Sequence, residues 1–476
     1  MKNKFNTYNK ATFFALLILP LLIPESLFAQ EQRKTIHQIE SEYFQNQQLD
    51  LNLIPETNVN SQLLESSVSN YEVYGYYPYW VGSYENYDWT ALTTIGYFSY
   101  EVDSETGGYT SIHGFDQSGI VEYAHERDVK VELCITCFGN AANRSILGDT
   151  VKQNTLIHTA VALVKDAGAD GINLDFESVP SDQRDNLTAF ITKMRAHLSN
   201  EVPNSRLTIC LYAVDWNSVF DVEAIVPHLD KLLIMGYDYY YSGSSYAGPV
   251  APLEAQNYYL AKSVDYYLDE GAPKNKLVLL LPWYGRRWTV LSEEKQSETA
   301  GRSKSMSYAT AKALVGNNTP ELDAQFATKW FNTTINDTLW QAWYDDTETL
   351  ETKYLYIKNK GIAGVGFWAL GYQGSGNEMW ETVKKVFSEE CSIEEQLSAG
   401  DINLSPNPIA KNEILNIKFN FDMKNFRIEI YDINGKLIGR YQHENIAIDE
   451  SFSSGTYILL VKSNGRIIAR KRFTIE

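Results

Sequence analysis

The sequence is poor in positive charge, and this shortage limits the partners that it can have. Its 476 residues contain 41 Lys and Arg against 60 Asp and Glu, which gives a formal net charge of −19 at pH 7. Nucleic-acid binding depends on basic patches that neutralise phosphates, so nucleic acid is not expected as a partner. Long apolar runs are also scarce. Beyond the N-terminus no stretch is long and apolar enough to span a bilayer, so no stable membrane span is expected.

Cysteine is scarce too, which argues against a metal site built on thiolates. The four cysteines are Cys134, Cys137, Cys210 and Cys391. The first two form a lone CxxC, with no second pair and no clustered His to complete a zinc site. The surrounding run, "VKVELCITCF", is typical of a buried strand, on which residues three apart face opposite sides. We expect structural cysteines, with a disulfide or redox role as the alternative, and neither a metal nor an organic cofactor.

The N-terminus carries the one pronounced apolar run. Lys2, Lys4 and Lys10 precede an apolar stretch from Ala11 to about Ile23, and small residues follow near Ala29. A basic start, a short apolar segment and a small-residue end are typical of a secretory signal peptide, predicted here over residues 1–29. Residues 30–70 are rich in Gln, Asn, Glu and Ser with weak periodicity, which predicts a loosely ordered polar leader or linker.

From Tyr71 the pattern changes to strands that alternate with helices. Eight apolar runs of strand length occur, at residues 72–80, 93–100, 129–138, 171–177, 207–214, 231–238, 276–283 and 362–370. Helix-like segments between most of them favour an α/β fold, a (β/α)8 TIM barrel. A doubly wound sheet is the alternative, but no Gly-rich phosphate loop follows the first strand. The gap of about 80 residues before the last strand predicts a small α+β insertion there.

The last part of the chain has a different texture. An acidic linker follows Ser388, and then short alternating strands are separated by Asn434-Gly435 and Asn464-Gly465, which are typical of two-residue hairpin turns. Residues 403–476 hold eleven Lys and Arg and eight Asp and Glu, a net charge of +3, so the acidity lies upstream. A C-terminal all-β sandwich is predicted. The expected organisation is signal peptide 1–29, leader 30–70, barrel 71–388 with its insertion at about 289–345, linker 389–402 and β-sandwich 403–476.

The fourth strand, within "DGINLDFE" (Asp170 to Glu177), alternates strictly between apolar and polar residues. Its polar parity, Asn173, Asp175 and Glu177, would point into the barrel, with Glu177 last, where barrel catalytic groups sit. A buried carboxylate pair needs a raised pKa in one member, which makes that member a natural general acid near neutral pH. The alternative is an inward polar layer satisfied by water or arginine.

"DGINLDFE" resembles the DxxDxDxE signature of glycoside hydrolase family 18, the chitinase-like TIM barrels. The resemblance extends over residues 72–388 and includes four further motifs in the family's order: "MGYD" (235–238), "PWYGRRW" (282–288), "WYDD" (343–346) and "GVGFWAL" (364–370). Any one of these would be weak evidence, but five in the right order are specific.

The resemblance implies a retaining mechanism without a protein nucleophile. Asp175 and Glu177 lie two residues apart on one strand, so they cannot flank a sugar in the ordinary layout, whose carboxylates face each other across the bond at about 5–5.5 Å. The family instead uses the substrate's 2-acetamido oxygen. Glu177 would protonate the leaving oxygen and later activate water, while Asp175 would orient the acetamido N–H.

Further roles carried over from the family concern substrate binding. Tyr237 would hydrogen-bond with the acetamido carbonyl, and Trp368 would form the apolar floor under the distorted sugar. Asp238 and Arg286 would bind the sugars beside the scissile bond, and Tyr76 and Tyr284 would line the walls.

One departure concerns Asn173, which stands where the family commonly has Asp. Asn cannot take that charge, but it can hydrogen-bond with Asp175. Barrels that resemble the spore-cortex peptidoglycan glucosaminidases carry a similar "NxDxE" form, and they also carry something like "SGSSYAGPVAPL" (242–253). The third strand, "CITCFGN", departs from the family's usual SxGG.

The resemblance therefore implies a secreted glycosidase that cleaves β-1,4 bonds next to N-acetylglucosamine in chitin or chitooligosaccharides. Two alternatives stay open. One is an N-acetylglucosaminidase of peptidoglycan or N-glycan cores. The other is a catalytically inactive, lectin-like barrel that binds chitin, although such relatives typically lose the terminal acid that Glu177 provides.

The C-terminal segment resembles the type IX secretion sorting domain. The residues that carry the likeness are "LSPNPI" (404–409), "IYDINGKLI" (430–438), "SSGTYILLVKSNGR" (453–466) and the basic end "ARKRFTIE". The resemblance implies that the type IX machinery is a partner. It also implies export through the periplasm to the outside or the outer-membrane surface. A carbohydrate-binding module is the alternative.

Overall fold

The computed structural model describes residues 34–45, 71–316, 318–388, 402–419, 426–432, 437–449, 452–463 and 466–476. The predicted signal peptide, Cys391 and the two hairpin turns at Asn434-Gly435 and Asn464-Gly465 lie outside these residues.

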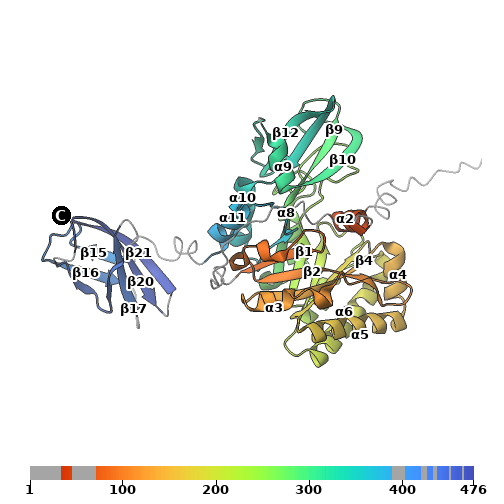
Figure 1. The fold of residues 1–476 in the computed structure, drawn as a ribbon, viewed down its shortest axis with the longest axis horizontal. Coiled ribbons are helices and arrows are strands. Elements are labelled where there is room, and N and C mark those ends of the chain that lie inside the picture. The colour runs from red at the N-terminus through yellow and green to blue at the C-terminus, as the bar shows by residue number, and fades with distance from the viewer. Residues whose placement is uncertain are drawn as a thin grey trace, which may run out of the picture.

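Eight parallel strands close into a barrel, as the alternating pattern predicts (Figure 1). Closure is direct, because the first strand pairs in parallel with both the second and the last. The strands are β1 (Glu72–Pro78), β2 (Thr94–Val102), β4 (Lys130–Phe138), β5 (Gly171–Glu177), β6 (Arg206–Tyr212), β7 (Lys231–Met235), β8 (Leu277–Pro282) and β14 (Gly364–Trp368). A short strand, β3 (Tyr109–Ser111), pairs antiparallel with the end of β2.

Helices cover the outside of the barrel and bury the apolar parity of the strands. Phe176 of β5 stacks on Phe190 with ring centroids 5.4 Å apart, so the outward face of this strand meets a helix, as predicted. The helix before β5 begins after Asp149, whose side chain caps two backbone N–H groups, and ends at Gly168 in the left-handed conformation. The helices are α3 (Ile120–His125), α4 (Asn140–Leu147), α5 (Thr150–Ala167), α6 (Arg184–Glu201), α7 (Val222–Ile225), α8 (Leu260–Asp269), α10 (Thr347–Lys360) and α11 (Glu378–Phe387).

The barrel interior contains a polar layer around Glu132 of β4. The buried Glu132 accepts hydrogen bonds from Thr208 at 2.6 Å and Tyr74 at 3.1 Å, and Arg206 pairs with it at 2.8 Å. Burial raises the pKa of Glu132 to about 7 against the opposing effect of Arg206. A Cβ on Gly96 would lie 2.7 Å from the Tyr74 hydroxyl, so glycine makes room for this layer.

The insertion between the seventh and eighth barrel strands is an α+β unit, as predicted. Its antiparallel sheet has the order β10-β9-β13-β12-β11 and surrounds a small core that includes Trp288, Trp330 and Trp343. The sheet starts at Tyr284, directly after β8, and therefore earlier than the expected 289. Its elements are β9 (Tyr284–Val290), β10 (Thr299–Ser307), α9 (Tyr308–Val315), β11 (Glu321–Asp323), β12 (Thr328–Ile335) and β13 (Thr338–Tyr344).

The C-terminal part is all-β, as predicted, and has a core of its own (Figure 1). A three-stranded sheet has the order β15-β16-β19, and a four-stranded sheet has the order β18-β17-β20-β21. Ile430, Leu459 and Phe473 belong to the buried cluster of this part. Its strands are β15 (Ile402–Ser405), β16 (Ile414–Phe419), β17 (Phe426–Asp432), β18 (Leu437–Tyr441), β19 (Asn445–Ala447), β20 (Gly455–Ser463) and β21 (Arg466–Ile475).

The leader departs from the expectation of loose order. Residues Ile36–Gln45 form helix α2, so that prediction is wrong for this segment. One face of α2 contacts the barrel: Phe44 stacks on Trp80 at 4.9 Å, and Gln45 donates a 2.8 Å hydrogen bond to Glu101 of β2. A helix of this length is marginal in water by itself, so its contacts with the barrel supply its stability.

The cysteines behave as structural residues within the part of the chain that the structure describes. Cys134, Cys137 and Cys210 are buried free thiols. Burial raises the pKa of Cys137 to about 12 and moves the other two in the same direction, which disfavours the reactive thiolate.

Candidate active site

The polar residues of β5 lie where the alternation predicts, on the inward face of the strand. Glu177 is the last residue of β5, at the carboxyl end where barrel active sites are built. Asn173, Asp175 and Glu177 are each at most 1% exposed. Two carboxylates therefore sit one above the other on a single strand, inside the ring and away from the outer helices.

Asn173 has hydrogen-bond partners on two other strands of the barrel. Its side-chain oxygen accepts a 3.0 Å hydrogen bond from Tyr76, and its amide nitrogen donates to Thr208 at 2.9 Å. Both of these bonds lead away from Asp175, the neighbour on the same strand face with which an Asn could also bond. Asn173 instead holds Tyr76 and links the site to the polar layer below it.

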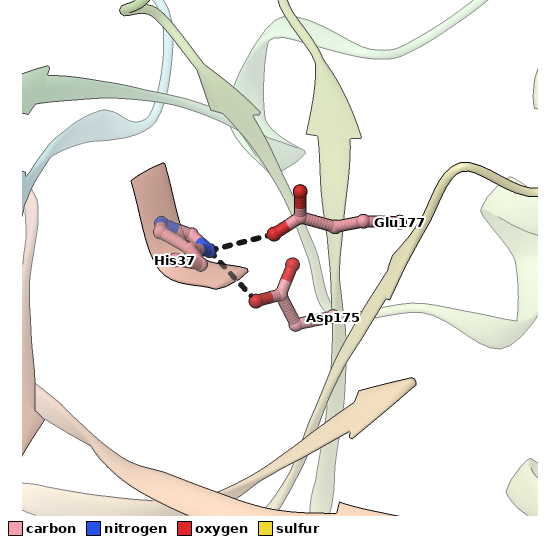
Figure 2. A group of neighbouring side chains, drawn as sticks. All are labelled: His37, Asp175 and Glu177. Atoms are coloured by element: carbon pink, nitrogen blue, oxygen red, sulfur yellow. Dashed lines mark hydrogen bonds and ion pairs between the residues drawn. The ribbon is translucent and has the colours of Figure 1, made fainter. Parts of the chain in front are cut away.

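Asp175 and Glu177 both meet a histidine from the leader helix (Figure 2). The Nδ1 atom of His37 lies 2.8 Å from Asp175 Oδ2, as a hydrogen bond, and 2.9 Å from Glu177 Oε1, as an ion pair. On its other side, Nε2 lies 2.8 Å from the hydroxyl of Tyr237. The imidazole thus contacts three of the four predicted catalytic side chains at once.

The charges in this cluster depend on one another. Burial opposes the charge on His37, but the carboxylates of Asp175 and Glu177 outweigh it and raise the His37 pKa to about 10. Burial and the neighbouring Asp175 raise the pKa of Glu177, while His37 and the hydroxyl of Thr35 oppose that rise. A carboxyl group that retains its proton more readily than usual suits the role of general acid near neutral pH.

Trp368, the last residue of β14, forms one wall of the same space. The His37 ring lies 3.8 Å from the Trp368 ring, measured between centroids, with the two planes inclined by 35°. The indole N–H donates a 2.9 Å hydrogen bond to Glu40 of α2, and the Tyr372 hydroxyl donates to the same oxygen at 2.6 Å. Burial raises the pKa of Glu40 to about 7, although both of these hydrogen bonds lower it.

The remaining predicted residues lie beside Tyr237, where the inserted sheet begins. The Tyr284 hydroxyl donates a 2.7 Å hydrogen bond to Asp238, and its ring lies 6.0 Å from that of Tyr237. Arg286 is 3% exposed, and its Nε and Nη2 atoms have no hydrogen-bond partner among the described residues. Buried guanidinium nitrogens without partners are costly, and a bound ligand with acceptor oxygens would satisfy them.

Within the described residues, one cluster brings three potential metal ligands together: His37, Asp175 and Glu177, with ligand atoms within 4.8 Å of one another. The raised pKa of His37 favours a protonated ring, which pairs with the two carboxylates, whereas a metal ligand must offer a lone pair at about 2.1 Å from the ion. The arrangement is that of an ion pair.

His37, Glu40 and Tyr372 were not foreseen. His37, Glu40 and Phe44 are spaced three and four residues apart, so they lie on one face of α2. That face is largely polar, so an apolar period does not reveal it.

An inward carboxylic acid at the end of a parallel barrel strand, with a second carboxylate beneath it and an aromatic wall beside it, defines a barrel of the glycoside hydrolase class. Residues 72–373 match the family model of glycosyl hydrolases family 18. The chain belongs to that family and is a glycoside hydrolase of the chitinase type.

Curated relatives share about a quarter of their residues with this chain. A probable endochitinase of Caenorhabditis elegans is 25% identical over 261 residues, which cover 49% of this chain and 42% of that protein. Di-N-acetylchitobiase of Rattus norvegicus is 24% identical over 314 residues, covering 60% of this chain and 78% of that protein. A putative sporulation-specific glycosylase of Bacillus subtilis is 23% identical over 239 residues, covering 49% and 54%.

Solved structures agree with the barrel fold. A family 18 chitinase from Cycas revoluta, in complex with (GlcNAc)3, superposes with a TM-score of 0.61 at 19% identity, covering 67% of this chain and all of that chain. The group IV chitinase of Ostrinia furnacalis, in complex with allosamidin, gives 0.60 at 19% identity, covering 66% and 98%.

The C-terminal sheets have a separate match. Residues 403–476 match the model of the secretion system C-terminal sorting domain, which indicates that the protein is exported. None of the helices in the described ranges has both the length and the apolarity that crossing a bilayer requires.

Proposed function

We propose that the protein cleaves β-1,4 bonds next to N-acetylglucosamine, in chitin or chitooligosaccharides, by retaining, substrate-assisted catalysis. The observation that carries this proposal is the position of Asp175 and Glu177 on one inward strand face, where they cannot face each other across a glycosidic bond. Glu177 acts as the acid and then the base. Asp175 orients the acetamido group, whose own oxygen attacks.

The position of His37 supports this assignment. Its flat ring covers Trp368, one nitrogen contacts Asp175 and the other contacts Tyr237. An acetamido group between the same two side chains would give its N–H to Asp175 and accept from Tyr237. The buried nitrogens of Arg286 and the Asp238–Tyr284 pair offer further polar contacts for the neighbouring sugars.

The substrate class is supported by what the relatives are called, which includes endochitinase and di-N-acetylchitobiase. Asn173 and the likeness to a sporulation-specific glycosylase favour peptidoglycan as the second candidate. The sorting domain supports secretion by the type IX machinery, to the medium or the outer-membrane surface.

The test compares a fluorogenic chitobioside, insoluble chitin, an N-glycan core and cell-wall sacculi as substrates. Because His37 contacts the carboxylates, the assay uses a His37→Ala chain, with His37→Ala/Glu177→Gln as the matched control. We expect hydrolysis of the chitobioside, reduced by roughly 10²–10⁴-fold in the control, as is typical for loss of a general acid. Cleavage of sacculi without chitin would favour the second candidate, and equal rates for the two variants would contradict the role of Glu177.

A further inference from the structure

Helix α2 occupies the space that a substrate would need. We infer that residues 36–45 are an intramolecular inhibitor, which keeps the enzyme inactive while docked and must leave before a sugar can reach Glu177. The inference rests on the proposed function for the identity of the site, and it adds a regulatory element that the proposed function does not contain.

At the base of the site, α2 contacts the same side chains that catalysis would use. His37 binds Asp175, Glu177 and Tyr237 at 2.8 to 2.9 Å and covers the ring of Trp368. While His37 is in place, no sugar can lie on Trp368 or receive a proton from Glu177. Occupation by His37 and occupation by substrate therefore exclude each other.

The rest of the helix is anchored along a line leading away from the carboxylates. Glu40 accepts hydrogen bonds from the Trp368 indole and from Tyr372. Ser41 and Gln45 both donate to Glu101, at 3.3 and 2.8 Å, and Phe44 stacks on Trp80.

The chemistry of these contacts is specific. Ile36, His37, Glu40 and Ser41 are all buried against the barrel. Burial of a histidine and a glutamate is unfavourable unless each meets complementary partners, and here each does. A leader that lay on the barrel by chance would keep such residues in water.

Docking within one chain is effective at low intrinsic affinity. Residues 46–70 connect α2 to the barrel, so the leader remains near the cleft and competes at a high effective concentration. The apparent affinity for substrate is then the intrinsic affinity multiplied by the fraction of molecules whose leader is undocked.

The test uses two readouts on the full chain and compares wild type with His37→Ala, Glu40→Ala and Phe44→Ala. Amide hydrogen exchange over residues 38–45 reports whether α2 is docked, independently of any sugar. Hydrolysis of the fluorogenic chitobioside reports whether the site is accessible. The matched control is Gln38→Ala, because the Gln38 side chain bonds with Glu42 on the same helix.

We expect slow exchange in wild type and in Gln38→Ala, and fast exchange in the other variants. We expect kcat/KM of the released variants to exceed that of wild type by about tenfold or more, because the undocked fraction limits the wild type. Fast exchange in wild type, or equal kcat/KM in wild type and in a released variant, would overturn the inference that α2 is an inhibitor. If no released variant hydrolyses any substrate while α2 is shown to dock, the proposed function fails instead, and the inhibitor fails with it.

Discussion

The carboxyl group of Glu40 should make docking of the leader depend on pH. Docked, Glu40 is buried against Trp368 and Tyr372, and its pKa is raised to about 7, mainly by burial. Undocked, it is a surface carboxyl near its ordinary value of 4.5. Since the docked state holds the proton more tightly, the contribution of Glu40 to docking is full below pH 4.5 and is lost as pH rises through 7.

The size of the effect follows from the two pKa values. A rise from 4.5 to about 7 is worth ~3 kcal/mol at about 1.4 kcal/mol per unit, which is roughly two orders of magnitude in the docking equilibrium. His37 makes a second pH-dependent contribution to docking. Its docked pKa is about 10 and its ordinary value is 6.5, so this contribution is lost as pH rises from 6.5 towards 10. His37 faces the carboxylates of Asp175 and Glu177, which are the charged groups that raise its pKa.

The assay is amide exchange of residues 38–45 at pH 5.5 and pH 8.5, corrected for the intrinsic pH dependence of exchange. Wild type should lose protection over this range. Glu40→Gln keeps the shape of the side chain without the titrating proton, so it should lose less protection than wild type, and the loss that remains is that of His37. An equal loss in wild type and Glu40→Gln, or no loss in wild type, would refute the reasoning.

Three further predictions concern other parts of the site and barrel. Asp175→Asn in the His37→Ala chain should lower kcat by roughly 10²–10⁴-fold while chitooligosaccharide binding persists by calorimetry; unchanged kcat would contradict the assisted mechanism. Arg206→Met leaves Glu132 buried without its cation, so the free energy of unfolding in urea should fall by ~3–5 kcal/mol, whereas an unchanged midpoint would contradict the buried pair. Phe44→Ala removes the stack on Trp80 and should weaken docking by about 0.5–1.5 kcal/mol beyond the loss of buried area, measured by exchange; wild-type protection would argue against it.

The barrel could be predicted because its signals are local. Each strand carries a short apolar run, and β5 alternates strictly, so the inward position of Asp175 and Glu177 follows from period two alone. The start of the insertion was missed because β8 runs directly through Trp283 into β9, with no turn signal between them.

The partners of Asn173 could not be predicted from its own strand. Asp175 is its neighbour on the same face of β5, but Asn173 bonds with Tyr76 and Thr208. These lie on β1 and β6, so the choice depends on how strands distant in sequence meet across the barrel interior.

The leader illustrates the largest gap between sequence and structure. Its composition predicts loose order, and its isolated helical tendency is weak. What orders α2 is a set of contacts made across more than a hundred residues of sequence, such as those of His37 with Asp175 and Tyr237. Because these contacts are polar, an apolar period could not reveal them.

The most direct test of the catalytic account changes the substrate's own nucleophile. The His37→Ala chain is given two fluorogenic chitobiosides, one with ordinary acetamido groups and one with trifluoroacetamido groups, whose carbonyl oxygens are poorer nucleophiles. Attack by the acetamido oxygen, with Glu177 as acid and Asp175 beneath it, predicts a steep fall in kcat for the fluorinated substrate. Equal kcat values for the two substrates would contradict it.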